Sequence, residues 1–134
     1  MGRRGKLVEF LKRVATVADI EALPLTTETI LVSRLDDEKA RTLTRLRQLR
    51  TLYQDGSPNL TDVGLAAIAR IDSLRSLDLE WCETITDDGL MTLKRLIGLE
   101  WLDIGFCSAL TEAGIRELQL ALPGCKIEGA LTTG

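Results

Sequence analysis

Residues 74–98 read LRSLDLEWCETITDDGLMTLKRLIG, and the two flanking stretches of equal length follow the same pattern. Residues 49–73 read LRTLYQDGSPNLTDVGLAAIARIDS, and residues 99–123 read LEWLDIGFCSALTEAGIRELQLALP. Leucine, threonine and glycine recur at fixed columns with no insertion: Leu49, Leu74 and Leu99; Leu52, Leu77 and Leu102; Thr61, Thr86 and Thr111; Gly64, Gly89 and Gly114. A period of about 20–50 residues is typical of a solenoid, in which each repeat is one supersecondary unit.

Each repeat changes its periodicity halfway along. The alternation of Leu77 and Leu79 predicts a short strand with one buried face. Thr86 followed by Asp87 and Asp88 predicts a helix start, with a capping hydroxyl and acids near the positive end of the helix dipole. The apolar positions that follow share a three-residue spacing: Leu90, Leu93 and Leu96. The unit is therefore a strand, a turn and a helix, and only stacked copies can bury a shared core.

The run L-x-x-L-x-L-x-x-C-x-x-I-T-D-x-G-L, from Leu74 to Leu90, resembles a leucine-rich repeat of the cysteine-containing subfamily. That subfamily is familiar from the repeat arrays of F-box substrate receptors and from small stand-alone proteins. The resemblance covers residues 49–123 and implies an α/β leucine-rich-repeat solenoid. A curved parallel sheet of about five strands would line its concave side and helices its convex side. The first repeat departs from the pattern at Gln54 and Ser57, which predicts a looser turn there.

The two ends of the chain carry weaker versions of the pattern. Residues 25–48 read as a degenerate repeat, with a strand at 30–32 and a helix at 36–48. Apolar residues at helical spacing predict a helix over 6–22 that covers the first repeat. The chain is thus expected to have four parts: an N-terminal capping helix (1–24), a degenerate repeat (25–48), three repeats (49–123), and a terminal strand with a tail (124–134).

The composition excludes several classes of function. The 134 residues fit one domain, and 20 acidic against 17 basic residues give a net charge of −3. The chain has no histidine, which removes Ser-His-Asp and Cys-His catalysis and histidine metal sites. We therefore expect no cofactor, no metal and no small-molecule substrate. A near-neutral charge gives no reason to expect nucleic acid.

The cysteines and the N-terminus indicate a cytoplasmic protein. Glu9, Lys12 and Arg13 interrupt the only stretch that begins like an export signal, and no apolar run is long enough to span a membrane. Cys82 and Cys107, 25 residues apart, should lie in adjacent repeats as reduced thiols that fill core sites and donate to turn carbonyls. A structural zinc site would need four ligands, and this chain has no histidine to add to the cysteines, so we expect no zinc site there.

The strand face that points away from the helices is predicted to be the binding surface. Four of the five aromatic side chains fall there, together with several acids. The predicted partner-binding residues are Tyr53, Asp78, Glu80, Trp81, Trp101, Asp103 and Phe106. Trp81 and Phe106, at the strand ends, have a second possible place over the edge of the core, whereas Tyr53 and Trp101 lie mid-strand and are harder to bury.

These features favour a non-enzymatic protein-interaction module, a subunit or regulator that binds a partner with a basic patch. Residues 23–35 are loosely similar to the opening of an F-box, which would make the chain a ubiquitin-ligase adaptor with a helical bundle over 1–48. Residues 1–13, with a charge of +4, could instead form an amphipathic helix on a membrane or on RNA. A hydrolase using Asp78 and Asp103 is the remaining alternative, although their open face would not exclude water.

Overall fold

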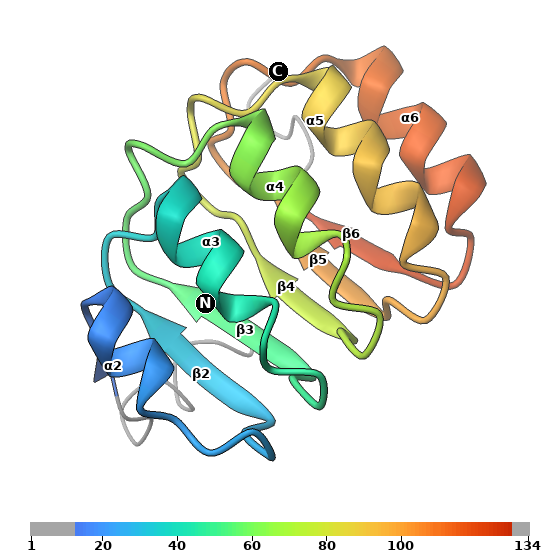
Figure 1. Cartoon of the computed structure of the whole chain (residues 1–134). Helices are drawn as coiled ribbons and strands as arrows, with labels where there is room; N and C mark the ends of the chain where they lie inside the picture. The colour runs from blue at the N-terminus through green and yellow to red at the C-terminus, as the bar shows by residue number, and fades with distance from the viewer. Residues whose placement is uncertain (1–12, 130–134) are drawn as a thin grey trace.

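Within the described residues, six parallel strands line up in one sheet, and each of the first five is followed by a turn and a helix (Figure 1). The computed structural model describes residues 13–129. The strands are β1 (Arg13–Val14), β2 (Thr29–Val32), β3 (Thr51–Gln54), β4 (Ser76–Asp78), β5 (Trp101–Asp103) and β6 (Lys126–Glu128). The helices are α2 (Val17–Glu21), α3 (Asp37–Leu43), α4 (Asp62–Ile68), α5 (Asp87–Met91) with its 3-10 continuation η1 (Thr92–Arg95), and α6 (Glu112–Ala121).

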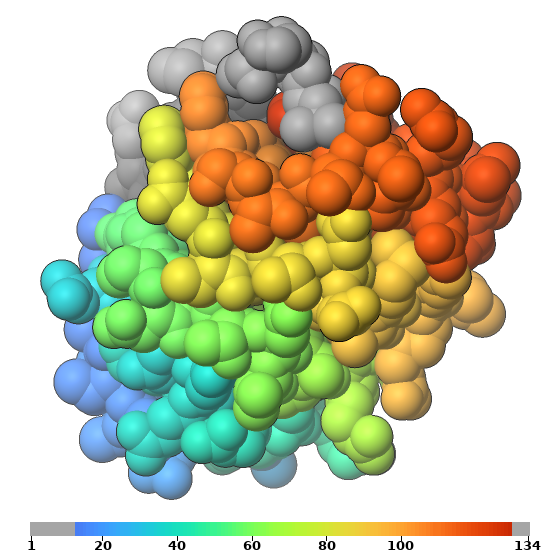
Figure 2. Space-filling view, turned by 90° about the horizontal axis from the view of Figure 1, so that it is seen from above, coloured from blue at the N-terminus to red at the C-terminus, as the bar shows by residue number. Residues whose placement is uncertain are grey.

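The strands follow one another across the sheet in chain order, and every neighbouring pair is parallel. All the described helices lie on one face of this sheet (Figure 1), and the repeats form successive bands of the surface (Figure 2). This is the predicted α/β solenoid. We call the sheet face opposite the helices the concave face.

Leucine columns between the sheet and the helices form the core. The strand register places Leu52 beside Leu77 and Leu77 beside Leu102, and all three side chains are fully buried. The helices contribute a matching column, in which Leu65, Leu90 and Ile115 are buried at 25-residue intervals. Because each repeat buries its apolar residues only against its neighbours, the core is continuous along the stack.

The N-terminal end differs from the prediction of one helix over residues 6–22. Residues 1–12 lie outside the described part, and the remainder forms β1 and then α2. Thr16 has an extended backbone and forms a capping box with Asp19, so α2 begins after it. Val14 pairs with Val32 of β2, which adds a strand to the sheet. Thr16 caps α2, so the helix cannot extend toward the N-terminus past this residue. Val14 is β-branched, which favours its place in a strand over a place in a helix.

The alternation of strands and helices continues through residues 13–48. Residues 29–32 form β2 within the sheet, and α3 follows at 37–43, shorter than the predicted helix at 36–48. These residues therefore form a repeat of the solenoid rather than the helical bundle that an F-box-like opening predicts. Within residues 13–129, no helix is long and apolar enough to cross a bilayer.

A carboxylate at the start of α3, of α4 and of α5 joins each of these helices to the next repeat. Asp62 accepts hydrogen bonds from the backbone N of Thr86 at 2.8 Å and from its hydroxyl at 2.6 Å. The same pair of bonds links Asp37 to Thr61 and Asp87 to Thr111. We call these three contacts the carboxylate clamps: Asp37–Thr61, Asp62–Thr86 and Asp87–Thr111.

The carboxylate clamps correct two predictions, the capping bond of Thr86 and the role of Asp87. Thr86 is the N-cap residue of α5, as predicted, but its hydroxyl makes no capping bond and donates to Asp62 instead. Asp87 was expected to act only on the helix dipole, whereas it also ties α5 to the next repeat. The repeated acids are therefore structural, because each one satisfies donors of a neighbouring repeat.

The first full repeat has a buried polar network where the next two repeats have an aliphatic residue and a cysteine. The Gln54 amide oxygen accepts from the Ser57 hydroxyl at 2.6 Å and from the Gly56 N–H at 2.9 Å. Its amide nitrogen donates to the Glu80 carbonyl at 2.8 Å. The two departures from the repeat pattern thus compensate each other, and the turn is fixed by hydrogen bonds rather than loosened.

Candidate functional site

The predicted site residues lie on the concave face and at the carboxyl ends of the strands. The register places Leu31, Tyr53, Asp78, Asp103 and Glu128 in one column across β2 to β6. The column changes from apolar in β2 and β3 to acidic in β4, β5 and β6. The concave face therefore combines an apolar half with an acidic half.

Tyr53 and Trp101 are buried, contrary to the expectation that these mid-strand aromatics are exposed. Each is 1% exposed, and together with Leu31 they form a cluster separate from the main core. Their ring centroids are 6.5 Å apart and their planes are tilted by 60°. The Trp101 indole N–H also donates to the Glu128 carboxylate. We call Leu31, Tyr53 and Trp101 the concave cluster.

Trp81 and Phe106 are the exposed aromatics. They are 52% and 50% exposed, and their rings stack with centroids 4.1 Å apart and planes 8° from parallel. Each follows its strand, β4 or β5, at the same position of the repeat, so neighbouring repeats bring the rings together. The alternative place for them, folded over the core edge, is not observed. We call Trp81 and Phe106 the aromatic pair.

The backbone at the aromatic pair adopts the left-handed conformation. The φ angles of Trp81 and Phe106 are 67° and 59°. The equivalent residue of the preceding repeat is Gly56, with a φ of 97°. A non-glycine residue in this region costs about 1–2 kcal/mol. The repeat turn therefore requires a conformation that suits glycine, and this chain places two large aromatic side chains there.

Three carboxylates lie near the aromatic pair in the sequence: Asp78 at the end of β4, Glu80 two residues later and Asp103 at the end of β5. Oxygens of Asp78, Glu80 and Asp103 lie within 4.8 Å of one another, and we call these residues the acidic cluster. Asp78 is fully buried, and Glu80 and Asp103 are half-buried. Oxygen ligands of this kind suit hard cations, but acidic groups gather on protein surfaces without one.

Two members of the acidic cluster shape the turns that carry the aromatic pair. Asp78 accepts from the Glu80 N–H at 2.9 Å, and Asp103 accepts from the Gly105 N–H at 2.9 Å. In both bonds the aspartate carboxylate accepts from the backbone N–H two residues later in the chain. The two bonds occupy the same position in neighbouring repeats. This bonding gives Asp78 and Asp103 a structural role in the turns.

The cysteine thiols lie in the core and not in the site. Cys82, Cys107 and Cys125 are free and buried. Cys107 donates to the Leu79 carbonyl at 3.0 Å, which confirms the predicted contact with a turn carbonyl. Burial raises the pKa of Cys82 strongly, that of Cys107 to about 12 and that of Cys125 to about 11. The neighbouring Cys107 adds to the shift in the pKa of Cys82.

These pKa values predict a loss of stability in alkali. The folded chain holds the thiol protons above the ordinary cysteine pKa of 9.0. Their contribution is therefore complete below pH 9 and falls as the pH rises further, by about 1.4 kcal/mol per pH unit for each thiol. Urea denaturation at pH 8 and pH 10.5 measures this decline. Cys82→Ala should decline less steeply than the wild type, and equal slopes would contradict the burial of this thiol.

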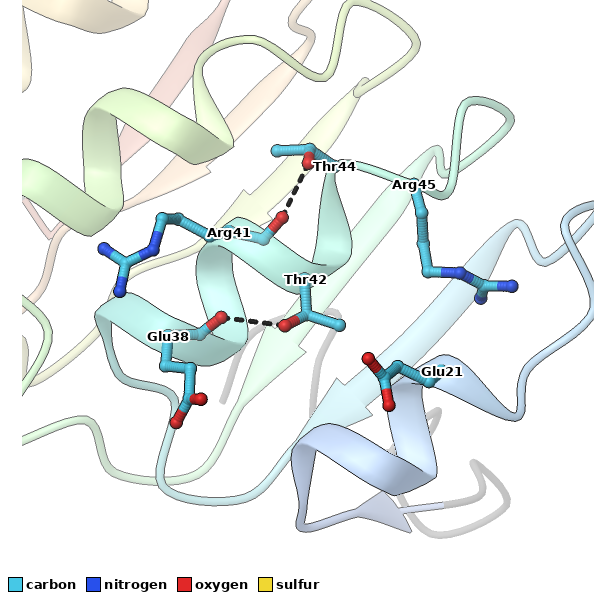
Figure 3. Close-up of a pocket in the computed structure, with 6 residues that line it drawn as sticks. All are labelled: Glu21, Glu38, Arg41, Thr42, Thr44 and Arg45. Carbon is cyan, nitrogen blue, oxygen red and sulfur yellow. Dashed lines mark hydrogen bonds between the residues drawn. The ribbon is translucent and has the colours of Figure 1, made fainter.

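A shallow depression on the helix side is lined by Glu21, Glu38, Arg41, Thr42, Thr44 and Arg45 (Figure 3). The Thr42 and Thr44 hydroxyls donate to the carbonyls of Glu38 and Arg41 within the α3 region. Arg45 donates to the Ile20 and Leu23 carbonyls at 3.1 Å, which satisfies the end of α2. Most of these polar groups thus serve the local fold.

The comparisons with known proteins agree with this architecture. Residues 73–94 match the family described as Leucine Rich repeat. A chain in the crystal structure of the yeast Rad7 and Elc1 complex has a similar fold, with a TM-score of 0.63 and 21% sequence identity. The match covers 73% of this chain and 27% of that one. No curated protein matches the sequence. Residues 73–94 therefore match a leucine-rich repeat, and the described residues have the fold of a leucine-rich-repeat solenoid.

Proposed function

We propose that this chain is a non-enzymatic protein-interaction module whose partner docks on the aromatic pair. The observation that carries this proposal is the exposed stack of Trp81 and Phe106 on two left-handed turns. Strained backbone persists where the surrounding structure enforces it, and it clusters at functional sites. Aromatic side chains with large exposed area are also the residues that most often dominate binding energy.

The acidic surroundings of the pair define the chemistry of the partner. Glu80 directly precedes Trp81, and Asp103 lies close to Gly105, which precedes Phe106. An arginine or lysine of the partner can stack on an aromatic ring while its charge faces these carboxylates. The proposed partner is therefore a protein with a basic patch. Its affinity should fall as salt is added, because salt screens exposed charges.

Removing the aromatic pair should weaken binding strongly without unfolding the chain. Trp81→Gly/Phe106→Gly relieves the left-handed backbone but loses a stack worth about 0.5–1.5 kcal/mol. These effects oppose each other, so the melting curve should stay near that of the wild type. The dissociation constant for a captured partner should rise about thirtyfold or more, which corresponds to a hot-spot loss of about 2 kcal/mol.

The matched control removes exposed apolar side chains elsewhere. Ile97 and Leu120 are 88% and 77% exposed, on the turn after η1 and on α6. Wild type, the glycine double variant and Ile97→Ala/Leu120→Ala serve as baits, and calorimetry then measures the affinity for each protein that wild type retains. The control should bind like the wild type. Equal affinity of all three baits would refute the proposed site.

A further inference from the structure

The residues in left-handed conformation form a row along one rim of the solenoid. The turns after β2, β3, β4 and β5 follow one another in that order (Figure 1), and each has one residue with a positive φ at the equivalent position of the strand register. We call these residues the rim row: Arg34, Gly56, Trp81 and Phe106, with φ angles of 51°, 97°, 67° and 59°. The rim therefore presents, in order, a cation, a position without a side chain, and two stacked rings.

Gly56 leaves space in the rim row where its two successors carry rings. A Cβ atom built at Gly56 would have no atom within 4 Å. The Trp81 ring thus stays clear of this position and stacks on Phe106, on its other side. Phe106 covers one face of the indole, and Trp81 is still 52% exposed. Because the stack runs along the row, the second face of the indole is turned toward the space beside Gly56.

The dimensions of this space suit one planar group. The rings of Trp81 and Phe106 stack at 4.1 Å, slightly less than the spacing of about 4.8 Å between neighbouring strands. A third ring at the same separation would lie over the Gly56 turn. The Arg34 turn lies about 5 Å further along the rim, within the distance of about 6 Å at which a cation attracts the face of an aromatic ring. We call Arg34, Gly56 and Trp81 the ring slot.

The charges around the ring slot decide between the two planar groups that proteins offer, an aromatic ring and a guanidinium. Arg34 is exposed and would repel a second guanidinium. Asp55, directly before Gly56, already forms an ion pair with Arg13. An aromatic ring is instead attracted from both sides, by stacking on the indole and by the Arg34 cation. We infer that the ring slot takes an aromatic side chain of the partner, which completes a row of three rings.

This inference rests on the proposed docking at the aromatic pair and adds a requirement on the partner. The partner should carry an exposed aromatic residue next to its basic patch. Its basic side chains would face Glu80 and Asp103, as proposed above, while its ring enters the slot. Gly56 is then the residue that determines specificity, because a large side chain at this position would occupy the slot.

The test uses N-acetyl-tryptophanamide as the probe and the full-length chain labelled with nitrogen-15. The chain has two tryptophans, so Trp81→Phe identifies the Trp81 indole N–H signal by its loss. We expect the probe to shift this signal, and N-acetyl-leucinamide to shift it several times less. Arg34→Asn keeps a residue that tolerates the left-handed turn. It should raise the dissociation constant of the probe about two- to fivefold, the value of one exposed cation–π contact.

Two controls accompany these titrations. Arg47→Asn removes an exposed arginine from another turn and should leave the dissociation constant unchanged. Gly56→Phe should place a ring of the chain itself in the slot and abolish the shift, whereas Gly56→Asn should retain most of it. Circular dichroism must show that both Gly56 variants remain folded, and the Arg34→Asn comparison stands without them.

Three results would overturn the inference: equal shifts with the tryptophan and leucine probes, tighter binding of N-acetyl-argininamide than of the tryptophan probe, or an unchanged dissociation constant in Arg34→Asn. The outcomes also separate the ring slot from the proposed function. Capture that is lost in Trp81→Gly/Phe106→Gly, while the probe leaves the Trp81 signal unmoved, would keep the proposed function and remove the slot. A probe that binds as expected, with equal capture by all baits, would keep the slot and refute the proposed docking.

Discussion

Replacing Trp101 with alanine should lower the free energy of unfolding by about 3–5 kcal/mol, the usual cost of truncating a buried tryptophan. The indole is 1% exposed, contacts Tyr53 at a centroid distance of 6.5 Å and donates to Glu128. The truncation would remove these contacts and leave a cavity in the concave cluster. Urea denaturation, followed by far-ultraviolet circular dichroism, measures the loss.

Trp81→Ala provides the comparison within the same chain. Trp81 is half exposed, and its main contact is the stack with Phe106. We expect it to cost about 0.5–1.5 kcal/mol, the value of one aromatic pair. The two tryptophans should therefore differ severalfold in their effect on stability. Similar losses for Trp101→Ala and Trp81→Ala would mean that the concave cluster is not a structural core.

Gly89→Ala should have the second large effect, because the added methyl group has no room. A Cβ atom at residue 89 would lie 2.1 Å from an Asp62 carboxylate oxygen. That carboxylate cannot move away without breaking its two bonds to Thr86. Overpacking costs about 1–3 kcal/mol, and charged hydrogen bonds worth about 1.5–3 kcal/mol would be weakened as well. These losses exceed the gain of about 1 kcal/mol that alanine brings to a helix interior.

The control for this substitution is Gly124→Ala, on the turn after α6. No atom lies within 4 Å of a Cβ placed there, and its φ is not positive. Its melting temperature should stay within a few degrees of that of the wild type. Gly64→Ala and Gly114→Ala should resemble Gly89→Ala, because they would meet Asp37 and Asp87 in the same way. A harmless Gly89→Ala would show that the carboxylate clamps do not hold the repeats together.

The sequence predicts the solenoid well because its signal is periodic. Leu52, Leu77 and Leu102 recur every 25 residues, and the structure places them side by side in β3, β4 and β5. A register of this kind follows from the repeat length alone, since equal repeats stack in register. The parallel sheet, the helices on one face and the buried cysteines could therefore all be deduced before the structure.

The burial of individual concave residues could not be deduced in the same way. The pattern correctly places Tyr53 and Trp101 on the strands, but it cannot show that their rings lean together across β4. The exposed stack was equally hidden, because Trp81 and Phe106 leave the strand plane through left-handed turns. Position along a strand is local information, whereas exposure depends on what lies above the sheet.

The role of the acids shows the same limit. The place of Asp87 after Thr86 fits helix-dipole stabilisation, which explains why the sequence favoured that reading. The clamp to Thr111 joins two repeats and becomes visible only when they are stacked. The signal that could have revealed this contact is the recurrence of an acid at one repeat position together with a threonine 24 residues later.

Hydroxyl-radical footprinting of the free chain and of the chain saturated with its captured partner tests the central claim most directly. Trp81 and Phe106 are half exposed in the free chain, so both should oxidise readily. We predict that the partner protects these two residues while oxidation of the exposed Ile97 and Leu120 stays unchanged. Undiminished oxidation of Trp81 and Phe106 in the complex, with protection at Ile97 or Leu120, would contradict the account and place the interface elsewhere on the surface.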